Sequence, residues 1–96
     1  MNYYNIPQEV EAQIRSRDKK CVYCGKTFSS NATIDHVDND TANMSPSNLV
    51  ICCNVCNASK GNKKLSVWIH SVYCKNHKIN NETVAPIIQE ALDKGL

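Results

Sequence analysis

Two Cys-x-x-Cys units constrain this chain more than any other feature. The first runs from Cys21 to Cys24 and the second from Cys53 to Cys56. Two residues between the cysteines let both sulfurs of a unit reach one metal ion, and two such units match the spacing of tetrahedral zinc sites. Four thiolates leave no open coordination position, so we predict a structural Zn²⁺ rather than a catalytic one. Disulfides and a rubredoxin-like iron site are the alternatives.

The length of the chain makes such a metal site important for folding. Ninety-six residues suffice for one small domain, predicted over residues 1–96, in which a metal ion contributes a material part of the stability. No apolar run has the length of a membrane span, and the N-terminus lacks the regions of a signal peptide. We therefore expect an intracellular, cytoplasmic protein that does not bind membranes. In a reducing compartment, paired cysteines favour metal over disulfides.

Local patterns predict a small α+β fold with a core at about residues 19–64. The β-branched, apolar segments 33–37 and 49–53 are predicted to form an antiparallel pair, joined by a polar loop. A helix should follow the second cysteine unit and end near Gly61. Flanking helices are predicted at about 6–18, 65–76 and 83–94. Within the second of these, four residues at helical spacing are expected in the core: Leu65, Trp68, Ile69 and Val72.

The distribution of charge says more than the net charge of +2. Between Thr41 and Asn81 there is no Asp or Glu, while five lysines fall in that segment: Lys60, Lys63, Lys64, Lys75 and Lys78. Segregated positive charge is typical of a face that binds a polyanion. A solvated, lysine-rich surface without a ligand is the simpler alternative.

Two cysteines lie outside the paired units. Cys52 should point away from Cys53 on the same strand, which predicts a small core residue. Cys74 lies at helical spacing from His70 and His77, a pattern that suits a second metal site. Three such residues on one helix are more often a coincidence. Whether they bind a metal stays open at this point.

The adjacent pair Asp35-His36 carries candidate catalytic chemistry. Neighbouring residues on a regular strand face opposite ways. Both side chains can serve one site only if the strand ends or bends there, so we expect an irregularity near His36. A surface pair at a strand end without a function is the alternative.

The order of these motifs resembles the HNH endonuclease family in its four-cysteine form. CxxCG, DH, a central Asn, CxxCN and KG follow one another between Arg15 and Trp68. The resemblance implies a ββα-metal core with a structural zinc. It also implies four catalytic-site residues. Asp35 and Asn57 would bind a catalytic Mg²⁺ or Mn²⁺, His36 would be the general base, and Asn48 would tie down the loop between the strands and help to orient His36.

The function that the resemblance implies is a divalent-metal-dependent endonuclease that hydrolyses DNA phosphodiester bonds. The products would carry 5′-phosphate and 3′-hydroxyl ends. Lys60, Lys63 and Lys64 would hold backbone phosphates, and little sequence specificity is expected. A stand-alone or phage-associated nuclease fits this description.

Two alternatives to an autonomous nuclease remain. A non-catalytic zinc-ribbon module that binds nucleic acid or protein would keep the cysteines and lysines, but it would leave Asp35, His36 and Asn57 without a role. An HNH subunit that needs a larger partner would keep the catalytic residues and lack DNA binding of its own.

Overall fold

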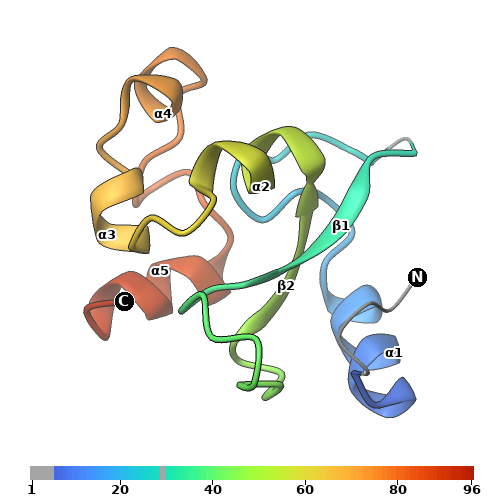
Figure 1. Cartoon of the computed structure of the whole chain (residues 1–96). Helices are drawn as coiled ribbons and strands as arrows, with labels where there is room; N and C mark the ends of the chain where they lie inside the picture. The colour runs from blue at the N-terminus through green and yellow to red at the C-terminus, as the bar shows by residue number, and fades with distance from the viewer. Residues whose placement is uncertain (1–5, 29) are drawn as a thin grey trace.

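A two-stranded antiparallel sheet lies at the centre of the fold (Figure 1). The structure is a computed structural model, and it describes residues 6–28 and 30–96. Strand β1 spans Ala32–His36 and strand β2 spans Leu49–Cys53. Their register places Asp35 opposite Val50 and His36 opposite Leu49. The predicted antiparallel pair is confirmed.

Helix α2, Asn54–Lys60, follows β2 without an intervening loop. Gly61 ends it with a φ of 51°, a backbone conformation that glycine adopts more readily than other residues. The two strands and this helix form a ββα unit, so the predicted α+β class is confirmed. The ββα unit brings the end of β1 close to α2, which is the arrangement on which the candidate site depends.

Helix α1, Gln8–Arg17, lies on one side of the sheet, within the range 6–18 that the sequence predicts (Figure 1). Its buried Ile14 packs in a cluster with residues from both strands, among them Ile34 and Ile51. The end of the helix also covers the outer edge of β2. The Arg17 guanidinium donates to the carbonyl of Leu49 at 2.6 Å, and the backbone N–H of Ile51 donates to the carboxylate of Asp18 at 3.0 Å. These bonds satisfy strand groups that would otherwise be open at a sheet edge.

Three short helices lie on the other side of the sheet (Figure 1). They are α3, Leu65–Trp68, α4, Val72–Asn76, and α5, Pro86–Asp93. Their buried residues join the larger apolar cluster, in which Trp68 and Ile88 pack with Cys52 of β2. Cys52 is fully buried, as expected for a core residue. Among the described residues, none of the helices has the length and apolarity required to cross a membrane.

The single helix predicted at 65–76 is replaced by α3 and α4. Ser71 separates them in an extended conformation, with a ψ of 163°, and its side chain accepts a hydrogen bond from the backbone N–H of Cys74. Serine competes for backbone hydrogen bonds in this way and favours a helix start over a helix interior. The break rotates the following residues, so Val72 is 71% exposed instead of buried. Leu65, Trp68 and Ile69 are buried as predicted.

Candidate functional site

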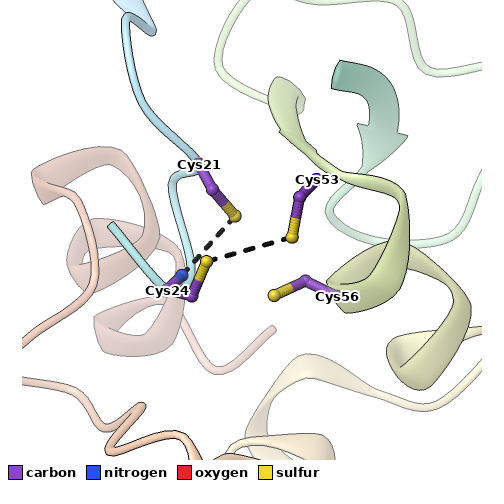
Figure 2. Close-up of side chains that lie close together, drawn as sticks. All are labelled: Cys21, Cys24, Cys53 and Cys56. Atoms are coloured by element: carbon purple, nitrogen blue, oxygen red, sulfur yellow. Dashed lines mark hydrogen bonds between the residues drawn. The ribbon is translucent and has the colours of Figure 1, made fainter. Parts of the chain in front are cut away.

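The four cysteines of the paired units converge on one point (Figure 2). Their sulfur atoms all lie within 4.8 Å of one another, and the sulfurs of Cys24 and Cys53 are 3.9 Å apart. A tetrahedral ion with Zn–S bonds of ~2.3 Å would hold its sulfurs at about 3.8 Å from each other. None of the four is in a disulfide. The cluster therefore suits a tetrahedral zinc ion, as the spacing predicted.

Each cysteine unit is shaped by its backbone. The first unit forms a tight turn in which the N–H of Gly25 donates to the carbonyl of Cys21 at 3.0 Å, and Gly25 has a φ of 76°. The N–H of Cys24 also points at the sulfur of Cys21, at 3.5 Å. In the second unit, Cys53 is the residue before α2 and Cys56 lies within the first turn of that helix. The first unit therefore places the sulfur of Cys21 near a backbone N–H group, and the second places its two cysteines at the start of a helix.

The protonation of the cluster reflects how close its sulfurs are. A hydrogen bond from Cys56 lowers the pKa of Cys21 to about 4, and the same interaction raises the pKa of Cys56. The hydroxyl of Tyr73 lies 3.2 Å from the sulfur of Cys56 and acts in the opposite direction on its pKa. The shared proton therefore favours the thiolate form of Cys21, and a thiolate is the form that binds a metal ion.

A second site lies at the end of β1, beside α2. A cavity of about 230 Å³ is lined by Asp35, His36 and Asn57, together with Asn39 and residues of the segment that follows α2. Strand β1 ends at His36, and the chain turns at once because the N–H of Asn39 donates to the carbonyl of His36 at 2.9 Å. The strand ends where we expected an irregularity, and both adjacent side chains line one cavity. Asn57 reaches it from the middle of α2.

His36 is 4% exposed. Burial lowers the pKa of its imidazole, against the opposing influence of the nearby Asp35 and Asp38 carboxylates. A lowered pKa keeps the ring neutral at neutral pH, which is the form that accepts a proton.

Asp35 is buried, and two donors converge on one of its oxygens. The Tyr23 hydroxyl donates to Oδ2 at 2.6 Å, and the ammonium Nζ of Lys60 lies 3.3 Å from the same oxygen. Burial, followed by the charge of Asp35, raises the pKa of Tyr23 well above its usual value, so the hydroxyl stays a donor. Across residues 6–28 and 30–96, neither hydrogen bond nor ion pair engages Oδ1. With the Asn57 amide lining the same cavity, this donor set fits a hard divalent cation.

Lys60 requires a correction. The sequence predicted that it holds a DNA phosphate, but its side chain is fully buried. Besides Asp35, its ammonium donates to Oδ1 of Asn39 at 2.7 Å and to the carbonyl of His36 at 3.4 Å. Three acceptors match the three N–H bonds of an ammonium group. Lys60 is therefore an internal residue of the site and does not present its charge at the surface.

Lys63 and Lys64 differ from Lys60, because both are exposed. They follow the end of α2, next to Gly61 and Asn62, which line the cavity. The Lys63 ammonium donates to the carbonyl of Ser59 at 3.0 Å and remains at the surface. These two lysines have the exposure that a phosphate contact needs.

Asn48 lies between the loop and β2. Its Oδ1 accepts from the N–H of Asp38 at 3.0 Å, and its Nδ2 donates to the carbonyl of Asn43 at 3.0 Å. Its own carbonyl accepts from the N–H of Val37, the residue after His36, at 2.8 Å. Asn48 thus ties the loop to the strand end that carries His36.

The three residues considered for a second metal site do not converge. His70 and His77 are exposed, whereas Cys74 is buried. The ring of His77 stacks on Tyr73 with centroids 4.1 Å apart. Among the described residues, the four-cysteine cluster is the only group of three or more His, Cys, Asp or Glu residues whose ligand atoms have metal-site spacing.

Sequence reasoning missed two residues of the site, Tyr23 and Asn39. Tyr23 lies inside the first cysteine unit, so its position beside a metal-binding turn was the available signal. Asn39 adopts a φ of 64°. Both the oxygen and the nitrogen of its side-chain amide make hydrogen bonds at the site. Its Oδ1 accepts from Lys60, and its Nδ2 donates to the carbonyl of Lys63 at 2.9 Å. Asparagine tolerates this left-handed conformation better than most residues.

Comparison with known proteins identifies the region that holds both sites. The family model described as HNH endonuclease matches residues 21–63. Among solved structures, the chain is similar to the Type II-C Cas9 enzyme from Actinomyces naeslundii, with a TM-score of 0.62 and 27% sequence identity. That match covers 76% of this chain and 8% of the enzyme's chain. Among curated proteins, the comparison found no match.

Proposed function

We propose that this chain, whose residues 21–63 match the family model described as HNH endonuclease, hydrolyses DNA phosphodiester bonds with the help of a divalent metal ion. The observation that carries the proposal is one cavity lined by a carboxylate, an imidazole and an amide, those of Asp35, His36 and Asn57. It lies in the same short ββα unit as a four-cysteine cluster suited to zinc. A zinc-ribbon module without catalysis would not require these three side chains to line one cavity.

In this proposal His36 is the general base. Its neutral imidazole takes a proton from the attacking water, and this step is typically worth about 10²–10⁴-fold in rate. The turn held by Asn39 and the loop tie made by Asn48 fix the backbone that directly follows His36. The products would carry 5′-phosphate and 3′-hydroxyl ends.

Asp35 and Asn57 are the proposed ligands of the catalytic metal. Two oxygen donors and a partly hydrated cavity suit Mg²⁺ or Mn²⁺ better than zinc. A bound ion would supply charge stabilisation at the phosphate and at the leaving 3′ oxygen. The protein's part is to hold the two donors on β1 and α2, whose relative position is set by the ββα unit.

DNA would be held mainly through its backbone. Lys63 and Lys64 are the exposed cations beside the cavity and would contact phosphates, with little reading of bases. Lys60 is not part of this surface.

An HNH subunit that works with a larger partner is a second candidate. It is favoured by the small share, 8%, of the Cas9 chain that this chain matches. A nuclease domain of this size would then receive DNA through a partner. Size-exclusion chromatography of the chain with DNA, followed by a nicking assay on the isolated chain, separates this case from autonomous activity.

The test of the proposed function is conversion of supercoiled plasmid to open circles. Purified, zinc-loaded protein is incubated with Mg²⁺, Mn²⁺ or EDTA. We expect nicking with either metal ion and none with EDTA. Asp35→Asn and Asn57→Ala should lose nicking while keeping their zinc. Asp35→Asn is preferred to alanine because it keeps an acceptor for Tyr23 beside the buried Lys60 ammonium.

Matched controls come from α4 and α5, away from the cavity. Asn76→Ala and Asp93→Asn change exposed residues of the same types and should nick like the parent. Equal nicking by Asp35→Asn and the parent would reject Asp35 as a ligand. Nicking that persists in EDTA would reject metal dependence.

A further inference from the structure

The buried ammonium of Lys60 touches the carboxylate that we propose as a metal ligand. Nζ lies 3.3 Å from Oδ2 of Asp35, and neither side chain is more than 7% exposed. In the proposed mechanism Asp35 binds the metal ion, whereas Lys60 has no assigned role. A buried cation beside a metal ligand therefore calls for its own explanation.

Hydrogen bonds fix the position of the Lys60 ammonium. Asn39 accepts from its ammonium at 2.7 Å, and Asn39 is itself held to the carbonyls of His36 and Lys63. The ammonium therefore has a fixed place at the end of β1. A long lysine side chain would otherwise extend to solvent, as Lys63 and Lys64 do.

The charge of Lys60 weakens the electrostatic attraction between the site and a cation. Asp35 brings one negative charge and Lys60 cancels it, so the pair is neutral as a unit. A divalent ion bound at Oδ1 would be attracted by the carboxylate and repelled by the nearby ammonium. The cavity lining holds no second carboxylate within the described residues. A phosphodiester in the cavity would restore one negative charge.

We infer that Lys60 is an internal counter-ion of Asp35 that keeps the divalent-metal site weak until a phosphodiester enters the cavity. Lys60 is then a positioning and regulatory residue, and metal and DNA bind cooperatively. Tyr23 contributes by bonding the same Oδ2, which leaves Oδ1 as the oxygen directed to the metal. The inference rests on the proposed function in one respect, because it takes Asp35 as the metal ligand.

The experiment measures Mn²⁺ binding by the loss of the free-ion signal in electron paramagnetic resonance, without DNA. Lys60→Met keeps the length of the side chain and removes the charge. We expect its dissociation constant for Mn²⁺ to fall by roughly tenfold to a hundredfold relative to the parent. Lys75→Met, which removes an exposed charge on α4, should leave the dissociation constant unchanged. A merely structural role for Lys60 predicts equal or weaker Mn²⁺ binding, and either result would overturn the inference.

A second arm tests the link to the phosphodiester. In a His36→Ala background, which prevents turnover, a short DNA duplex should tighten Mn²⁺ binding more when Lys60 is present than when it is methionine. Equal tightening in both proteins would refute the coupling. Lys60→Gln, which can still bond Asn39, serves as a second neutral variant. Thermal melts and zinc content verify both, and unfolding of both variants would count against the inference.

Different experimental results would reject the proposed hydrolase function and the proposed counter-ion role of Lys60. If the parent does not nick plasmid but Lys60→Met still tightens Mn²⁺ binding, the counter-ion role stands and the hydrolase function falls. If the parent nicks plasmid and Lys60→Met has unchanged Mn²⁺ affinity, the hydrolase function stands and the counter-ion role falls.

Discussion

The Tyr23 hydroxyl donates to Oδ2 of Asp35 at 2.6 Å. This bond joins the turn of the first cysteine unit to the strand that carries the proposed catalytic residues. Tyr23 is 1% exposed, and its ring packs edge-on against Trp68 with centroids 5.0 Å apart. The four-cysteine cluster and the cavity lined by Asp35 are therefore connected through one buried side chain.

Replacing Tyr23 with phenylalanine removes this bond and keeps the ring. The carboxylate of Asp35 would lose a buried donor, and hydrogen bonds to charged groups contribute about 1.5–3 kcal/mol. We expect the free energy of unfolding to fall by about that amount, with zinc content unchanged. Urea unfolding of Tyr23→Phe, Asp35→Asn and the double variant measures it. Additive losses in the double variant would show that the two residues do not interact.

Removal of the zinc ligands should unfold the chain. Zinc binding supplies on the order of 10 kcal/mol of folding free energy in small domains, and this domain is small. Elemental analysis should find one zinc per parent chain and none in Cys56→Ser, whose circular dichroism should be that of an unfolded chain. Cys74→Ser alters a buried cysteine outside the cluster and should keep its zinc. Full zinc in Cys56→Ser would show that the cluster is not the binding site.

Lysine substitutions should separate surface charge from internal charge. Lys63→Ala and Lys64→Ala should each weaken DNA binding on unrelated sequences and reduce the slope of log affinity against log salt by about 1. Lys75→Ala is the exposed control. Lys60→Ala should lower stability and leave the salt slope unchanged, because its ammonium is internal. Fluorescence anisotropy at several salt concentrations is the measurement. If Lys60→Ala were the only variant to alter the salt slope, the result would support the phosphate contact first predicted for Lys60.

The parts of the site that the sequence predicts are those set by local spacing. The Cys-x-x-Cys units, the strand pair and the end of β1 at His36 depend on residues close together along the chain. The role of Lys60 depends on how α2 packs against β1, and the role of Tyr23 on how the first cysteine turn packs beneath Asp35. Neither packing contact has a short-range signature. The break at Ser71 has a local signal, because serine favours a helix start. The apolar spacing of the same segment favoured one continuous helix.

The pH dependence of cleavage should reflect the buried state of His36. Burial lowers the pKa of its imidazole below the ordinary value of ~6.5. The neutral, proton-accepting form therefore persists to lower pH than in an exposed histidine, and activity should fall only as the pH drops through that lowered pKa. Nicking rates from pH 5 to 8 at saturating Mn²⁺ give the profile. A midpoint above 7 would contradict the neutral-base assignment.

The central claim is that His36 is the base that activates water. It is tested most directly by the single-turnover nicking rate of His36→Ala, measured beside His70→Ala, an exposed histidine outside the site. The account predicts a rate lower by about 10²–10⁴-fold for His36→Ala, with unchanged zinc content and no recovery in excess Mn²⁺, and a parental rate for His70→Ala. A His36→Ala rate within a few-fold of the parent, or full recovery in excess Mn²⁺, would contradict it.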